Sequence, residues 1–301
     1  MRTAAPPTYA SAFVVADETA AWGQRTHLRL TRLELGLLIL AAASGLVRTT
    51  VGAREVDLGG LIAVVLFALA LALRAYRLTT RPTRIWQDGR AAAESIKTLC
   101  WKYAAGSRLF PRDLDDAAAD RLFVERLREV LDTIRDLQRV QPSRAGHEEI
   151  TGWMRELRAA PLEERRAVYE RDRIDDQQRW YAGKSEVNRR QAQRWGVGVL
   201  ALEFLGVAIG AVKAFGLWST GSTTGVLVGL VATVGAAAAA WVQAKQYATL
   251  ASAYAIADQE LASVRALTKH VVDEAAWAEF VDSAETAISR EHTMWRAART
   301  S

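Results

Sequence analysis

The chain has 301 residues, of which half are hydrophobic and 24% are charged, and its formal net charge is +5. The mean hydropathy of −0.02 would suit a soluble protein, but the apolar residues are concentrated in four blocks almost free of charge. The single cysteine, Cys100, excludes an intrachain disulfide, and the first thirty residues do not resemble a secretory signal peptide.

The N-terminal part of the chain predicts a tail followed by a transmembrane hairpin. Residues 1–17, with two prolines and small side chains, are expected to be disordered. Residues 18–110 form a first module with spans over about 33–50 and 57–74. These two apolar blocks are slightly shorter than the roughly 20 residues that cross a bilayer, unless flanking residues are included. We expect the second span to continue as a helix into the cytosol, because residues 85–103 contain almost no helix breaker.

The middle of the chain, residues 111–160, predicts a cytosolic helical insert. Leucines recur at helical spacing over 113–140, which is typical of an amphipathic helix. A loop should follow at Pro142 and Gly146, and then a short helix around Trp153.

Residues 161–301 form a second module of the same kind. One long helix should run from Leu162 into a third span over about 196–215, and the fourth span, about 224–243, should likewise continue as a helix. Asp273 is a suitable cap for a last helix. No strand-like alternation is sustained, so the predicted fold is all-α, with two transmembrane hairpins, four spans in total, and long helices that extend into a cytosolic domain.

Charge at the span ends predicts the orientation. Basic residues gather at one end of each span: Arg25, Arg29 and Arg32 before the first, Arg74, Arg77, Arg81 and Arg84 after the second, Arg189, Arg190 and Arg194 before the third, and Lys245 after the fourth. The positive-inside rule therefore places both termini and the central segment in the cytoplasm. Trp195, Trp218 and Trp241 lie at span ends, where indole rings prefer the membrane interface.

Two features inside the spans could carry function. Gly206 and Gly210 in the third span, and Gly225 and Gly229 in the fourth, are spaced for close helix contact in lipid, either within the hairpin or between subunits. Glu203 lies within the hydrocarbon layer, where an ionised carboxylate costs roughly 2.5–3.5 kcal/mol. It is a candidate pore-lining residue, or alternatively a neutral or hydrogen-bonded glutamate that joins helices.

The sequence lacks the patterns of an enzyme. It contains no phosphate-binding glycine loop and no nucleophile elbow, and its four histidines have no metal-ligand spacing. We expect no catalytic, cofactor-binding or metal-binding residues. Carboxylates alternate with arginines over residues 165–194, which argues against nucleic acid as a partner.

Three segments resemble the SLATT family of two-transmembrane effector domains: residues 86–101, residues 171–195 and the tail from residue 289. The first two resemble the motif helices of two successive modules. The residues that carry the likeness are Trp86, Arg90, Glu94, Lys97, Arg173, Gln177, Trp180, Tyr181, Lys184, Arg290, Glu291, His292 and Trp295.

The resemblance implies a bacterial membrane effector of a conflict system. Such proteins are often encoded beside nucleotide-making or nucleotide-sensing proteins and are thought to form pores in the inner membrane. We therefore expect a cyclic homo-oligomer that conducts ions and is triggered through its cytosolic helices, with membrane lipid and nucleotide-signalling proteins as partners. The alternative is a non-conducting membrane-anchored scaffold that displays its cytosolic helices to another protein.

Overall fold

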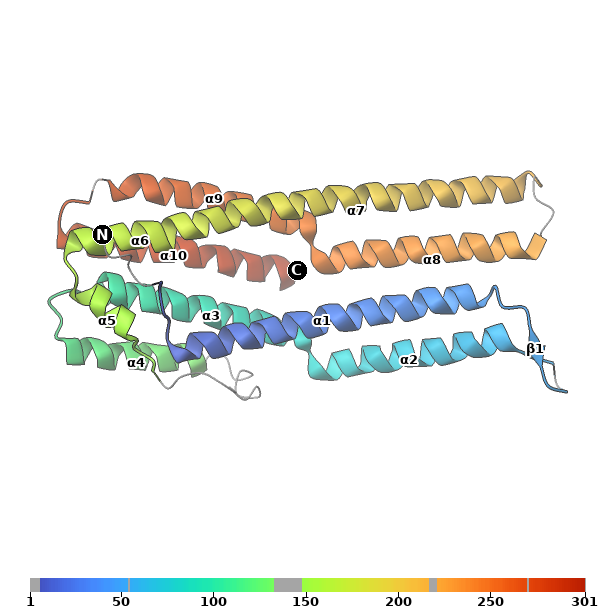
Figure 1. Ribbon diagram of the computed structural model, residues 1–301, viewed down its shortest axis with the longest axis horizontal. Helices are drawn as coiled ribbons and strands as arrows, with labels where there is room; N and C mark the ends of the chain where they lie inside the picture. The colour runs from blue at the N-terminus through green and yellow to red at the C-terminus, as the bar shows by residue number, and fades with distance from the viewer. Residues whose placement is uncertain (1–5, 54, 133–147, 217–220, 270, 301) are drawn as a thin grey trace. The chain divides into compact units, whose positions relative to one another are not determined.

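The computed structural model describes residues 6–53, 55–132, 148–216, 221–269 and 271–300, with backbone only for 221–222 and 290–300. Its helices are α1 (Ser11–Ser44), α2 (Leu58–Thr80), α3 (Pro82–Ala105), α4 (Asp116–Asp132), α5 (Gly152–Ala159), α6 (Leu162–Tyr169), the π-helical η2 (Glu170–Asp175), α7 (Asp176–Ala214), α8 (Gly221–Lys245), α9 (Tyr247–Thr268) and α10 (Glu274–Thr300) (Figure 1). The predicted helical fold is confirmed. The described strands are the two-residue β1 (Thr50–Val51) and β2 (Val56–Asp57), which pair antiparallel between α1 and α2.

The chain divides into two compact units, and each is built from separate stretches of sequence. The hairpin unit comprises residues 25–82 and 187–250, and the helical core unit comprises residues 1–24, 83–186 and 251–301. Because α1 and α7 each contribute residues to both units, neither unit corresponds to a continuous half of the chain.

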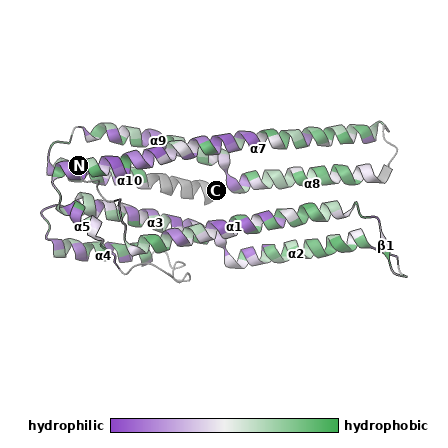
Figure 2. Ribbon diagram, viewed as in Figure 1, coloured by the Kyte–Doolittle hydropathy of each residue, from purple (hydrophilic) through white to green (hydrophobic). Residues whose placement is uncertain are grey.

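The hairpin unit carries the apolar sequence, which is green along α2 and α8 in Figure 2. Among the described residues, three helical stretches are long and apolar enough to cross a membrane: Leu58–Ala105, Leu162–Ala214 and Thr223–Thr268. Large apolar side chains of this unit, including Leu71, Phe204 and Val207, are exposed on the isolated chain. A surface of this kind needs lipid or protein to cover it.

The helix at the first predicted span ends before the predicted boundary. This helix, α1, ends at Ser44 rather than near residue 50, and the residues beyond it turn into the β1–β2 ribbon. The Asp57 carboxylate then caps α2, accepting a hydrogen bond from the Gly59 amide at 3.0 Å. Gly59 packs so closely on the end of α1 that an added Cβ would lie 2.6 Å from the Ser44 carbonyl oxygen.

Long helices follow α2 and α8, as expected, but one residue interrupts the helix in each case. Arg81 adopts a left-handed conformation (φ 45°) between α2 and α3, and Gln246 does the same (φ 51°) between α8 and α9. Pro82 explains the first break, because proline disfavours the α conformation in the residue before it and suits the first position of a new helix. No comparable residue marks the second break, although it occupies the corresponding place in the second module.

The predicted disordered tail, 1–17, is wrong for the residues that the structure describes. The helix α1 begins at Ser11, and Ala10 and Ala16 are fully buried. The Ser11 hydroxyl donates to the Glu149 carboxylate at 2.6 Å, and the Thr151 hydroxyl donates to the Thr8 carbonyl at 2.8 Å. Small side chains were interpreted as a sign of disorder, whereas here they allow the segment to pack closely.

The remaining elements mostly follow the sequence pattern. The amphipathic helix α4 covers Asp116–Asp132; residues 113–115 of its predicted range precede the helix, and residues 133–140 lie outside the described residues. The long helix from Leu162 forms as α6, η2 and α7, with one π-helical turn. Asp273 caps α10 as predicted, since its carboxylate accepts a hydrogen bond from the Ala276 amide at 2.8 Å.

Gly89 allows α3 to lie against α1 in the helical core unit. A Cβ at this position would lie 2.8 Å from the Ala20 amide nitrogen and 3.1 Å from the Ala16 carbonyl oxygen, and backbone atoms cannot move aside as flexible side chains can. We predict that Gly89→Ala lowers the thermal unfolding midpoint, because overpacking costs about 1–3 kcal/mol and exceeds the roughly 1 kcal/mol gained in helix propensity. Circular dichroism of the detergent-solubilised protein measures this.

Gly183→Ala is the matched control, because Gly183 lies within α7 and an added Cβ would meet nothing within 4 Å. We expect this variant to be as stable as the wild type or slightly more so. If Gly89→Ala were equally well tolerated, the close contact between α1 and α3 would not contribute to stability.

Candidate functional site

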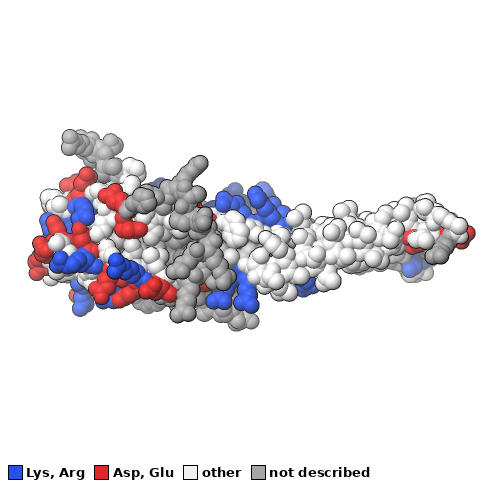
Figure 3. Space-filling model, turned by 90° about the horizontal axis from the view of Figure 1, so that it is seen from below, with Lys and Arg blue, Asp and Glu red and all other residues white. Residues whose placement is uncertain are grey.

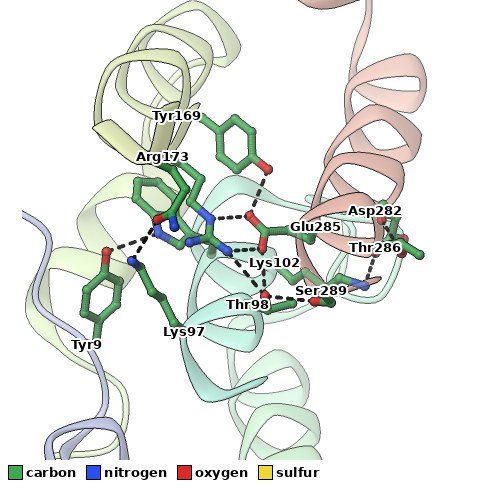
Figure 4. Close-up of polar contacts among 12 residues, drawn as sticks. Tyr9, Lys97, Thr98, Lys102, Tyr169, Arg173, Asp282, Glu285, Thr286 and Ser289 are labelled. Carbon is green, nitrogen blue, oxygen red and sulfur yellow. Dashed lines mark hydrogen bonds and ion pairs between the residues drawn. The ribbon is translucent and has the colours of Figure 1, made fainter. Parts of the chain in front are cut away.

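A fully buried ion pair lies at the centre of the helical core unit. Arg173 comes from η2 and Glu285 from α10, and both side chains are inaccessible to solvent. The guanidinium contacts the carboxylate with both ends of its fork, Nε to Oε1 at 2.8 Å and Nη2 to Oε2 at 2.6 Å (Figure 4). This bidentate geometry is the strongest form of arginine–carboxylate contact.

Neighbouring hydroxyls satisfy the remaining positions of the Glu285 carboxylate. Thr98 of α3 donates to Oε2 at 2.9 Å, and the buried Tyr169 donates to Oε1 at 2.9 Å. Arg173 is less completely satisfied, because its Nη1 is buried and has no hydrogen-bond partner within the described part of the chain. Because both side chains are fully buried, a substrate could reach the pair only if the unit opened. We therefore interpret the pair as a structural connection between helices.

The π-helical turn helps to explain how Arg173 enters the core. A π-turn inserts an extra residue into a helix and so rotates the side chains that follow it. Two other arginines of this region, Arg158 and Arg165, are also buried, and they bind backbone carbonyls. Arg158 donates to the Phe110 carbonyl oxygen at 2.9 Å, and Arg165 donates to the Ala105 carbonyl oxygen, at the end of α3, at 2.8 Å. Arg165 thus caps the end of α3, where carbonyls lack helical partners, and Arg158 satisfies a carbonyl of the loop that follows α3.

The structure brings the motif residues of the first and second modules together. Lys97 of α3 donates to the Gln177 side-chain carbonyl of α7 at 3.4 Å. Arg90 of α3 pairs with Glu94 at 2.8 Å, and its guanidinium lies 5.8 Å from the ring centroid of Trp180 on α7.

Lys184 approaches the same Trp180 ring at 5.7 Å, and Tyr181 is buried beside it. Trp86 lies on α3, one turn before Arg90. The side chains of Arg290, Glu291, His292 and Trp295 lie outside the described residues.

Sequence reasoning missed three members of this site, Glu285, Tyr169 and Tyr9. Glu285 occurs among apolar residues of α10 that recur at helical spacing, and an acidic residue inside such a stripe was the available signal. Tyr9 gave no signal, because it belongs to the segment interpreted as disordered. Burial raises the pKa of Tyr9 to about 12, and its hydroxyl accepts a hydrogen bond from the Trp101 indole at 3.3 Å.

In the hairpin unit, Glu203 lies on an exposed part of α7. No hydrogen bond or ion pair to its carboxylate occurs among the described residues, and the neighbouring Phe204 and Val207 are strongly exposed. The carboxylate therefore lies on an apolar surface that the isolated chain leaves uncovered.

The four glycines of the third and fourth spans do not share one role. A Cβ at Gly206 would meet Val231 at 3.6 Å, and a Cβ at Gly225 would meet the Lys213 ammonium at 3.5 Å, so these two lie within the hairpin contact. Gly210 and Gly229 would meet nothing within 4 Å. Half of the predicted packing surface is therefore open for contact with something other than this hairpin.

The buried pair gives a test of what holds the helical core unit together. We predict that Arg173→Met lowers the free energy of unfolding by about 3–5 kcal/mol, because it leaves Glu285 as a buried carboxylate without its cation. The double variant Arg173→Met/Glu285→Leu should recover part of this loss. Thermal unfolding of the purified protein, followed by circular dichroism, measures both.

The exposed pair Arg126–Glu129 on α4 is the control, because its 2.8 Å contact is open to water. Arg126→Met should change stability much less than Arg173→Met. Equal effects of the two substitutions would show that burial gives the Arg173–Glu285 pair no special importance.

Comparison with protein families identifies two domains in the chain. Residues 10–166 match the SMODS and SLOG-associating 2TM effector domain 3, and residues 169–295 match the SMODS and SLOG-associating 2TM effector domain 1. No curated protein and no solved structure matches the chain. The boundary between the two matches falls within α6, so Arg173 and Glu285 belong to the second domain and Thr98 to the first. The chain therefore belongs to the SLATT family of membrane-associated effectors in conflict systems, and it contains two SLATT domains in tandem.

Proposed function

We propose that the protein is a pore-forming effector of the bacterial inner membrane that acts as a cyclic homo-oligomer. The observation that carries this proposal is the exposed Glu203 carboxylate on the apolar surface of α7. Such a group is costly in lipid, by roughly 2.5–3.5 kcal/mol at the membrane centre, unless it faces protein or water. Copies of α7 around a central axis would place Glu203 against neighbouring protein and a water-filled path. The Glu203 carboxylates would then form a ring that favours cations.

The open glycines support an assembly of several copies. Gly210 and Gly229 offer smooth helix surfaces that no described residue of the same hairpin occupies. Helices in lipid associate through small residues of this kind, because van der Waals contact replaces the hydrophobic effect there. Four spans from one chain enclose too little space for a hydrated channel, so conduction requires a closed ring of chains.

The proposal includes a fourth span formed by α1. This helix lies beside α2, because Glu34 of α1 pairs with Arg77 of α2 at 3.1 Å and Gly59 of α2 packs on Ser44 at the other end. In each hairpin, the start of the first helix and the end of the second would then lie on the same side of the membrane. The basic residues at these ends favour the cytoplasmic side. In this arrangement the helical core unit is cytoplasmic, and a nucleotide-signalling protein acts on it as the trigger. The proposed function involves no enzymatic reaction, cofactor or nucleic acid.

The alternative is a membrane-anchored scaffold that conducts nothing. Its support is apolar surface on the helical core unit, where Val272 is 82% exposed and Leu267 is 59% exposed. A partner protein would cover these side chains. Purified protein that remains a monomer in mild detergent and passes no ions through liposomes would favour the scaffold over the pore.

Glu203 provides the decisive test of the pore. In liposomes that contain the purified chain under a salt gradient, we predict that Glu203→Gln shifts the reversal potential toward lower cation preference, because the ring loses its negative charge. The control is Glu55→Gln, which removes a carboxylate from the loop between β1 and β2 instead. An unchanged reversal potential in Glu203→Gln would exclude Glu203 from the conduction path.

Orientation is tested with cysteines at exposed positions. Cys100 itself is unsuitable, because it is fully buried and no thiol reagent would reach it from either side. In a Cys100→Ala background, we predict that Val51→Cys reacts with a membrane-impermeant thiol reagent in intact cells, because Val51 is 54% exposed between the first two spans. Glu279→Cys, on α10, should react only after permeabilisation. Reaction of Glu279→Cys from outside would reverse the proposed orientation.

A further inference from the structure

Two cations from different helices meet at one indole ring in the hairpin unit. The guanidinium carbon of Arg32 on α1 lies 4.8 Å from the ring centroid of Trp241 on α8, and the Lys245 ammonium lies 5.4 Å from the same centroid. The two positive charges are therefore within about 10 Å of each other. Trp241 itself is 9% exposed, so its ring is a fixed wall rather than a mobile surface group.

Neither cation forms an ion pair in the part of the chain that the structure describes. The carboxylate closest in sequence is Glu34, and it is already held by Arg77 at 3.1 Å and Arg74 at 3.9 Å. The Arg77 guanidinium also donates to the Thr31 hydroxyl at 3.2 Å, which fixes this pairing in place. Two like charges that converge without a carboxylate repel each other, and an anion between them would offset that repulsion.

The position of this pair along the helices indicates the kind of anion. Arg32 precedes the apolar stretch of α1, and Lys245 follows that of α8, so both lie where an apolar surface ends. Figure 3 shows basic side chains gathered beside the white, uncharged surface. Lipid phosphates occupy this level of a bilayer, and a tryptophan with lysine or arginine is typical of it. Leu33, next to Arg32, is exposed and offers a surface for an acyl chain.

We infer that Arg32, Lys245 and Trp241 form a binding site for the phosphate group of an anionic membrane lipid. The two cations hold the phosphodiester, the buried indole holds the cations in place, and the adjoining apolar surface at Leu33 holds the start of the acyl chains. The inference rests on the proposed membrane-spanning arrangement of the hairpin unit, but it does not require that the protein conducts. Because α1 and α8 come from different SLATT domains, a lipid at this site would connect the two hairpins.

The test uses the full chain in mild detergent, titrated with phosphatidylglycerol, phosphatidylcholine or inorganic phosphate, with bound molecules counted by native mass spectrometry. The wild type should retain phosphatidylglycerol in preference to phosphatidylcholine. Arg32→Gln/Lys245→Gln should weaken the tightest phosphatidylglycerol binding about tenfold or more, since one charge-assisted contact is worth roughly a factor of ten. Arg32→Lys should retain most of the affinity, because it keeps the charge.

The control is Arg29→Gln/Arg194→Gln, which removes the same charge from exposed positions of the hairpin unit. It should weaken binding by less than about threefold, a small electrostatic effect. Trp241→Phe, which keeps an aromatic wall, should weaken binding moderately and preserve the fold, as checked by circular dichroism. This variant keeps the inference testable if the double charge variant does not fold.

Three outcomes would overturn the inference: an equal loss of phosphatidylglycerol affinity in the two double variants, binding of phosphatidylcholine as tight as that of phosphatidylglycerol, or binding of inorganic phosphate as tight as that of the lipid.

Ion flux through liposomes is measured separately. If flux persists without anionic lipid and the Arg32→Gln/Lys245→Gln variant binds phosphatidylglycerol as tightly as the wild type, the lipid site is overturned and the pore proposal stands. Selective lipid binding by a chain that conducts nothing would overturn the pore and leave the site.

Discussion

The pairing of Arg173 with Glu285 is the interaction on which the helical core unit depends. Taking both charges out of water costs several kcal/mol per ion, and only their two-pronged contact and the hydroxyls of Thr98 and Tyr169 offset that cost. These groups come from α3, α6, η2 and α10, so the helices must be in register before the pair can be satisfied. A buried pair of this kind adds little net stability, but it favours the one arrangement of the helices in which both charges are paired.

The same contacts connect the two SLATT domains. Each domain contributes one hairpin to the hairpin unit and long helices to the helical core unit, so the boundaries of the family matches and of the compact units do not coincide. The Trp277 indole of the second domain donates to the Ala105 carbonyl of the first at 2.8 Å, and Lys102 pairs with Asp282 at 2.9 Å. Neither domain can bury its apolar helix faces in this way without the other.

The two domains also share a helix break at the same place. In each, the second hairpin helix is followed by one residue with positive φ, Arg81 or Gln246, and a new helix begins at the next position. A left-handed residue stops a helix because its backbone cannot continue the hydrogen-bond ladder. The repetition of this break at the same place is consistent with two modules of the same kind.

The sequence by itself determined the helical fold, the apolar hairpins and the family, because apolar blocks, their basic ends and the motif residues around Trp86 and Trp180 are local patterns. Asp273 was readable as a helix cap for the same reason. Only the tertiary structure decided which residues meet. Burial of Ala10 and Ala16, the partner of Arg173, and the division of the four glycines into two contacted and two open positions depend on side chains far apart in sequence. Such contacts arise from packing between helices, and no periodicity within one helix encodes the partner that another helix will present.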